Sequence, residues 1–197
     1  MGSTTRFPPI VDATIVFSYC RRRYPFTEPR SRALITESIH DQSVVLRLES
    51  TEKAHAIREL IRRAKVFDSL DDAEALGHSV IRREDVMSTG FGRGVAIAHG
   101  ESACIDRALV VLGLSERGVE FDSADGKPVH ILFLVVIPAG KQSGYLDILS
   151  RLSGILRIPE NRNRLRACSC IGEVASTVRE ALDEIESERH QRNSLRK

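Results

Sequence analysis

The spacing of apolar residues predicts strands and helices from residue 34 onwards. Apolar runs at 44–48, 107–114 and 129–137 predict strands, and the last run is apolar at nearly every position, which is typical of a strand covered on both faces. Apolar residues recur at helical spacing over 54–64, 73–80, 145–156 and 174–185, and a short helix is expected at 162–167. With a short β-prone run before His99, the tally is about four strands and five helices, which favours a layered α/β domain with a mixed sheet.

Residues 1–33 show no sustained periodicity. They hold four of the seven prolines and carry six basic groups against two acidic ones, a net charge of +4. We therefore expect a poorly ordered basic N-terminal extension at 1–33, a domain at 34–186 and a charged C-terminal tail at 187–197. The whole chain has a net charge of +2, so residues 34–197 sum to −2, which argues against a nucleic-acid partner. We interpret the run Arg21-Arg22-Arg23 as solvated tail rather than as a patch for phosphate or an acidic partner.

The apolar runs are too short for a membrane span. The longest, 131–139, has nine residues, whereas a bilayer needs roughly 20, and the first residues lack a secretory pattern. The four cysteines fit neither a zinc spacing nor a disulfide framework, which indicates a reducing compartment: Cys20, Cys104, Cys168 and Cys170. We expect a cytoplasmic protein with no direct membrane insertion, no metal and no cofactor.

The most unusual stretch lies at 88–100, where three glycines in five residues precede a short β-prone run that ends at His99. The glycines alone indicate only a turn with close backbone approach. His99 is flanked by Ala98 and Gly100, so its imidazole is accessible to a large reactant as a base, metal ligand or nucleophile. A structural histidine is the commoner case, and spacing alone leaves both interpretations open. The remaining histidines are expected at the surface or, for the last named, at a strand edge: His40, His55, His78, His190 and His130.

The segment that begins with Arg83-Glu84 and continues as Ser-Thr-Gly-Phe-Gly-Arg-Gly-Val-Ala-Ile-Ala-His-Gly at 88–100 resembles a known signature. It is similar to that of the type-2 enzyme IIA domains of the bacterial phosphoenolpyruvate-dependent sugar phosphotransferase system (the fructose, mannitol and nitrogen-regulatory branch). Later landmarks also match, namely 125–129, an apolar strand ending at Pro138 and a Leu-rich helix beginning at Tyr145. The resemblance covers roughly residues 34–186. It implies a three-layer α/β/α sandwich around a small mixed sheet.

The resemblance also implies a phosphotransferase activity. His99 would accept a phosphoryl group from an HPr-like phosphocarrier protein, and the chain would pass it to a IIB component or use it as a signal to a regulatory target protein. Arg83 would hold the phosphate oxygens with its forked guanidinium. The alternative interpretation is that Arg83 is a solvent-facing helix residue beside Arg82. Neutral hydrogen bonds to the phosphate are expected from three residues of the glycine turn: Ser88, Thr89 and Gly90.

Two positions depart from the family pattern. Ala98 replaces the proline before the histidine, which loosens the backbone but removes no reacting group. Tyr145 stands where many members carry a second active-site histidine, and a tyrosine donates one hydrogen bond but is not cationic near neutral pH. These departures leave open an alternative function, a regulatory binding module with the same fold that no longer transfers phosphate. The absence of a fused IIB-like, membrane or HPr-like segment leans slightly towards a regulatory role.

Overall fold

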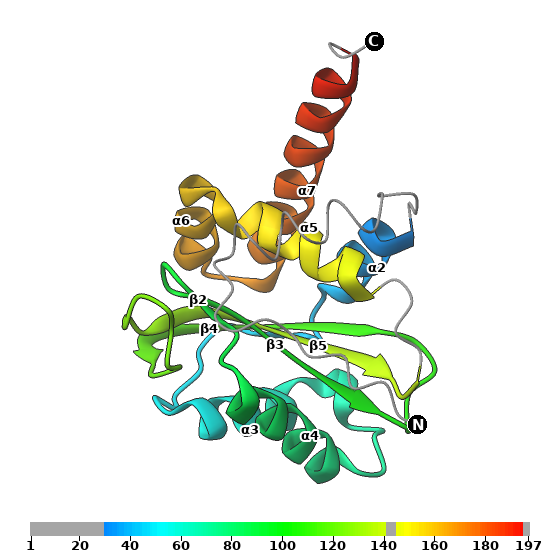
Figure 1. Cartoon of the computed structure of the whole chain (residues 1–197), viewed down its shortest axis with the longest axis vertical. Helices are drawn as coiled ribbons and strands as arrows, with labels where there is room; N and C mark the ends of the chain where they lie inside the picture. Colours follow the sequence, from blue (N-terminus) through cyan, green and yellow to red (C-terminus); the bar gives the residue numbers. More distant parts are fainter. Residues whose placement is uncertain (1–29, 141–144, 195–197) are drawn as a thin grey trace, which may run out of the picture.

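The computed structural model describes residues 30–140 and 145–194, which form three layers (Figure 1). A five-stranded mixed sheet occupies the middle, in the order β1-β4-β5-β3-β2. Strand β1 runs parallel to β4 and β3 parallel to β5, whereas the β4–β5 and β2–β3 pairs are antiparallel. The strands are β1 (Val44–Val45), β2 (Gly90–Gly92), β3 (Val95–Ser102), β4 (Leu109–Val119) and β5 (Val129–Pro138).

Helices cover both faces of the sheet. One face carries α3 (Lys53–Arg63), the short 3-10 helix η1 (Lys65–Phe67) and α4 (Ala73–Val86), shown below the sheet in Figure 1. The other face carries α2 (Arg30–Ser38), α5 (Tyr145–Arg157), α6 (Pro159–Ala167) and α7 (Ile171–Ser194). This arrangement confirms the expected three-layer α/β/α sandwich. None of the described helices is both long enough and apolar enough to cross a membrane.

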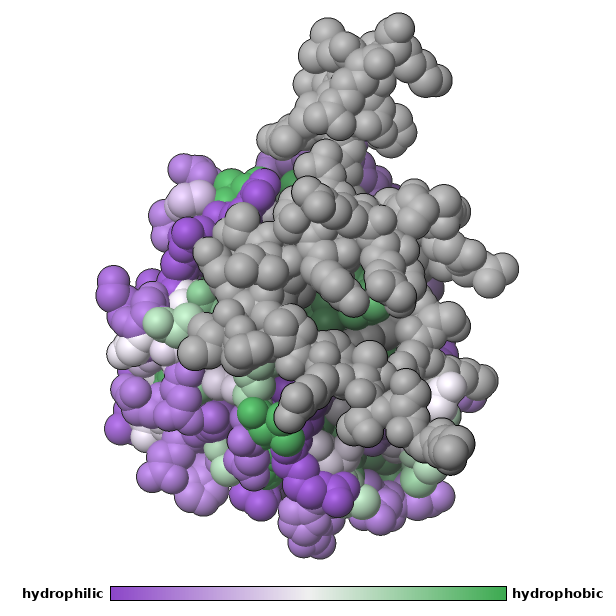
Figure 2. Space-filling model, in the orientation of Figure 1, coloured by the Kyte–Doolittle hydropathy of each residue, from purple (hydrophilic) through white to green (hydrophobic). Residues whose placement is uncertain are grey.

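Two apolar cores lie on either side of the sheet, because successive strand residues point to opposite faces. Val95 and Ile97 of β3 join the core beneath α5 and α7, whereas Ala96 and Ala98 join the core above α3 and α4. Every residue of β5 except His130 is buried, which confirms a strand covered on both faces. The outer surface of α3 and α4 is mainly hydrophilic in the space-filling view (Figure 2).

The structure differs from the sequence prediction at two strands. The strand expected at 44–48 pairs only at Val44 and Val45, and the chain then turns so that the Leu48 amide donates to the Leu114 carbonyl at 2.8 Å. The glycine turn, in contrast, contains strand β2, which was not expected. Its pairing with β3 uses backbone groups, so glycines form it without a side-chain pattern.

Both predicted domain boundaries, before residue 34 and after residue 186, fall within helices. Helix α2 begins at Arg30, so residues 30–33 are helical rather than part of a loose extension, and Ile35 and Ile39 anchor this helix in the core. Helix α7 continues to Ser194 and includes most of the segment expected as a tail. Residues 1–29, including the Arg21-Arg22-Arg23 run, lie outside the described residues.

Candidate functional site

His99 lies inside β3 rather than at its end, because the strand continues to Ser102. Its backbone pairs with Val135 of β5, and strand alternation places its side chain on the same side of the sheet as Ile97, towards the layer that contains α5. Strand β2 pairs with β3 only at Val95 and Ala96. Within residues 30–140 and 145–194, no strand pairs with the outer side of β3 at His99, and the imidazole is half-buried.

The two residues that flank His99, Ala98 and Gly100, are small because both are tightly packed. A Cβ on Gly100 would lie 2.6 Å from Val80 Cγ2 and 3.3 Å from the Val80 backbone nitrogen, so glycine allows α4 to pack directly on β3. Ala98 is fully buried and in register with Leu134. The strand ladder therefore fixes the backbone that the missing proline was expected to loosen.

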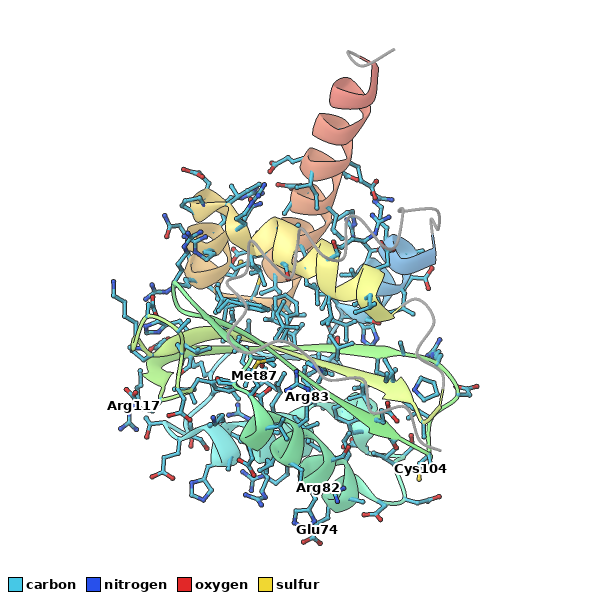
Figure 3. The ribbon with its side chains drawn as sticks, viewed as in Figure 1. Glu74, Arg82, Arg83, Met87, Cys104 and Arg117 are labelled. Atoms are coloured by element: carbon cyan, nitrogen blue, oxygen red, sulfur yellow. The ribbon has the colours of Figure 1, made fainter. Side chains whose placement is uncertain are left out.

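Arg83 is brought to this part of β3 by the last turn of α4. The N-cap of this helix is Asp72, whose carboxylate accepts a hydrogen bond from the Ala75 amide at 2.8 Å. At the other end, Arg83 Nη1 donates to the Met87 carbonyl at 3.0 Å. Figure 3 shows Arg83 and Met87 between α4 and the sheet, and Arg82 on the opposite side of the helix. Arg83 is thus the arginine of this pair that faces the sheet.

The surroundings of His99 keep its imidazole neutral at pH 7. Burial, which has the largest effect, and the positive charge of Arg83 together lower the pKa of His99 to about 4, against the opposing effect of the Ile97 carbonyl. That carbonyl lies 3.3 Å from His99 Nδ1. Because a carbonyl oxygen only accepts, this contact places the proton on Nδ1 and the lone pair on Nε2. The site therefore holds a neutral imidazole in one tautomer, with a guanidinium acting on it.

Ser88, Thr89 and Gly90 use their polar groups differently from the expectation. The Ser88 hydroxyl donates to the Phe121 carbonyl at 2.6 Å and accepts from the Gly90 amide at 3.2 Å. The amide and hydroxyl of Thr89 both donate to the carboxylate of Glu84. Each hydroxyl has a single proton, so neither donates to a phosphate while these bonds persist. These residues hold the turn between α4 and β2. No role was expected for Glu84, although it follows Arg83 in the segment that carries the resemblance and lies four residues after the buried Val80.

The glycine alternation is explained by backbone conformation. Gly92, Arg93 and Gly94 have φ angles of 77°, 60° and 78°, a left-handed run that glycine adopts readily. The Arg93 amide donates to Asp125 Oδ2 at 2.7 Å, and this bond lowers the pKa of the Asp125 carboxyl. The turn reverses the chain tightly from β2 into β3, as the sequence predicts. The bond to Asp125 holds the turn at Arg93, two residues before β3 begins at Val95.

Tyr145 is the first residue of α5, as predicted, and its side chain lies outside the described part. In the described part of the chain, no group of three or more His, Cys, Asp or Glu residues is arranged to hold a metal ion. Cys168 and Cys170 are free thiols where α6 ends and α7 begins. The remaining described histidines also occupy the expected places: His40, His55 and His78 are exposed, and His130 lies at the start of β5 with its Nδ1 2.9 Å from the Ser115 carbonyl.

Comparison with known sequences gives consistent matches. A family model described as "Phosphoenolpyruvate-dependent sugar phosphotransferase system, EIIA 2" matches residues 37–181. The fructose-specific EIIABC component of Bacillus subtilis is 34% identical over 131 residues, which is 66% of this chain but only 21% of that longer protein. A nitrogen regulatory protein of Bradyrhizobium diazoefficiens is 29% identical over 133 residues, covering 68% of this chain and 86% of that protein.

Comparison with solved structures also finds IIA proteins. The nitrogen regulatory protein IIA-Ntr from Neisseria meningitidis has a TM-score of 0.67 and 31% identity, covering 74% of this chain and 99% of that one. A complex of enzyme IIA mannitol with phosphorylated enzyme IIB mannitol from Escherichia coli has a TM-score of 0.59 at 15% identity, covering 71% of this chain and 95% of that one. At that identity the second match speaks for the fold alone.

Proposed function

Because the chain belongs to the EIIA 2 family of the phosphoenolpyruvate-dependent sugar phosphotransferase system, we propose that it is a phosphoryl carrier with His99 as the acceptor. The observation that supports this most directly is the state of the imidazole. Its pKa of about 4 keeps the ring neutral near pH 7, and the Ile97 carbonyl leaves the lone pair on Nε2. A neutral imidazole with a directed lone pair is a good nucleophile towards phosphorus.

In the proposed step, Nε2 of His99 forms a bond to phosphorus as the bond from phosphorus to the donor nitrogen breaks. The electron pair of the broken bond stays with the donor imidazole. Such transfers pass through a loose transition state, so they depend on positioning and on stabilisation of the phosphoryl oxygens. Arg83 supplies a positive charge that acts on the ring and serves this purpose. The His99 ring gains positive character when the new bond forms, and the Ile97 carbonyl stabilises it through the Nδ1 proton.

The proposed donor is an HPr-like phosphocarrier protein. The acceptor is a IIB component, or the phosphorylated form acts as a signal to a regulatory target. The family description supports the phosphotransferase context, and similarity to both a fructose-specific component and nitrogen regulatory proteins supports these two roles. In either role, the negative charge of a phosphoryl group beside Arg83 changes the surface that a partner protein meets.

The test is transfer of labelled phosphate from phosphoenolpyruvate in the presence of the general carrier proteins. The wild-type protein should take up one phosphoryl group, and the product should be acid-labile and stable in alkali. His99→Ala should take up none. His78→Ala, which removes an exposed histidine from α4, is the matched control and should behave as the wild type. Uptake by His99→Ala at the wild-type rate would refute the assignment. Absence of uptake by the wild type would favour the inactive binding module.

A further inference from the structure

A buried carboxylate next to Arg83 in sequence takes no part in the proposed transfer step. Glu84 is 2% exposed and lies four residues after the fully buried Val80, on the side of α4 that faces the sheet. Its Oε2 accepts from the Thr89 amide at 2.9 Å, and its Oε1 accepts from the Thr89 hydroxyl at 2.6 Å. A buried carboxylate is costly unless its oxygens are hydrogen-bonded. The two bonds therefore tie Thr89 firmly to the last turn of α4.

Thr89 is in turn connected to both groups of the candidate site. Its carbonyl accepts from the Ile97 amide at 3.4 Å, and the Ile97 carbonyl is the group that lies 3.3 Å from His99 Nδ1. The bonds from Thr89 to Glu84 also close the segment 84–89 into a loop. That loop contains the Met87 carbonyl, which receives Arg83 Nη1 at 3.0 Å. The partners that hold Arg83 and His99 are thus both attached to Thr89.

We propose that Glu84 is a positioning residue for phosphoryl transfer, which binds Thr89 and thereby holds the Arg83 guanidinium beside His99. This inference rests on the proposed function. The charged groups that act on Glu84 are Arg83 and Lys53, and burial of the carboxyl raises its pKa against the opposing effects of these cations and of Thr89. If Thr89 is released, the Met87 carbonyl moves and the guanidinium is no longer held at the ring. Both transfer and the effect of the Arg83 charge on His99 then weaken.

The test uses three variants of the full-length protein and two readouts. Glu84→Leu removes both acceptors and keeps apolar bulk, whereas Glu84→Gln keeps an acceptor for the Thr89 amide and offers its own amide to the hydroxyl. Glu74→Gln is the control, because Glu74 lies in the first turn of α4 and points away from the sheet (Figure 3). The readouts are the rate of phosphoryl uptake and the pKa of His99, measured by NMR titration of the imidazole. The second readout requires no phosphotransfer.

Glu84→Leu should slow uptake about tenfold or more and raise the pKa of His99. Glu84→Gln and the control should stay close to the wild type in both readouts. In an Arg83→Gln background, Glu84→Leu should raise the pKa of His99 no further, because the guanidinium it positions is already gone. A folded Glu84→Leu variant with the wild-type rate and pKa would overturn the proposal, as would an equal rise in pKa in the Arg83→Gln background.

A second variant covers the case in which Glu84→Leu does not fold, and the titration of His99 covers the case in which the wild type takes up no phosphate. If Glu84→Leu does not fold, Thr89→Val removes only the hydroxyl donor and should slow uptake and raise the pKa of His99 by a smaller amount. Unchanged values in Thr89→Val would then overturn the proposal. If the wild-type protein takes up no phosphate, the proposed function fails. The titration of His99 still decides whether Glu84 positions Arg83.

Discussion

The low pKa of His99 predicts how the stability of the protein changes with pH. In the unfolded chain a histidine titrates near 6.5, whereas in the folded protein His99 titrates at about 4. Above about pH 6.5 the ring is neutral in both states and has no effect. As the pH falls from about 6.5 to about 4, the unfolded chain binds a proton that the folded protein does not, so the free energy of unfolding decreases. Below about pH 4 both states are protonated and the decrease stops.

The size of the effect follows from the same two values. A tenfold change in proton affinity corresponds to about 1.4 kcal/mol, so the difference between 6.5 and about 4 amounts to about 3 kcal/mol over the window. Other groups, including Glu84 with its raised pKa, also change stability in this range. The comparison is therefore made with His99→Asn, which keeps a polar side chain that does not titrate. Subtracting the two pH curves isolates the contribution of His99.

The assay is urea denaturation of the wild type and His99→Asn at intervals from pH 4 to 8. The wild type should lose about 3 kcal/mol more than the variant as the pH falls through the window. His78→Asn, which removes an exposed histidine, should follow the wild-type curve. Parallel curves for the wild type and His99→Asn, or a wild type that gains stability relative to the variant at low pH, would refute the reasoning that burial and Arg83 keep the imidazole neutral.

Three other substitutions test separate features. Arg83→Lys should fold normally but slow phosphoryl uptake about tenfold in rapid-quench measurements, because a single ammonium does not reproduce the guanidinium fork; an unchanged rate would remove Arg83 from the site. Tyr145→Phe should slow uptake about fivefold, as one neutral hydrogen bond supplies about 1 kcal/mol, and Tyr145→His should match or exceed the wild type; a silent Tyr145→Phe would make the residue purely structural. Gly100→Ala should lower the free energy of unfolding by about 1–3 kcal/mol, because its Cβ meets Val80 Cγ2 at 2.6 Å. Gly77→Ala, whose Cβ would have its nearest contact at 3.8 Å, should not destabilise the protein in the same denaturation assay.

The parts of the fold that the sequence predicts are those with long, regular patterns. Strand β5 is apolar at nearly every position because helices cover both of its faces, and α5 and α7 carry apolar stripes over several turns. Strand β2 and helix α2 lack such patterns. Strand β2 contains two glycines and pairs through its backbone, and among the nine residues of α2 Ile35 is fully buried while Leu34 packs against the same core. Short elements held by tertiary contacts leave little trace in the sequence.

The candidate site shows the same division. The stretch at 88–100 draws attention to His99, and the family resemblance assigns roles to His99 and Arg83; in the structure α4 packs on β3 and the charge of Arg83 acts on His99. The sequence does not predict which hydroxyls remain available for a ligand. Ser88 donates to the carbonyl of Phe121, which is 33 residues away, and no local pattern reveals such a partner. The tautomer of His99 likewise depends on the geometry of the Ile97 carbonyl, which exists only in the folded strand.

The central claim, that a neutral His99 accepts the phosphoryl group through Nε2, is tested most directly by NMR of the phosphorylated protein. Imidazole nitrogens labelled with nitrogen-15 show which ring nitrogen is bonded to phosphorus, and comparison with His99→Ala assigns the signal to the residue. We expect a single phosphohistidine at His99, bonded through Nε2, with the proton retained on Nδ1 towards the Ile97 carbonyl. A phosphoryl group on Nδ1, or on any other residue, would contradict it.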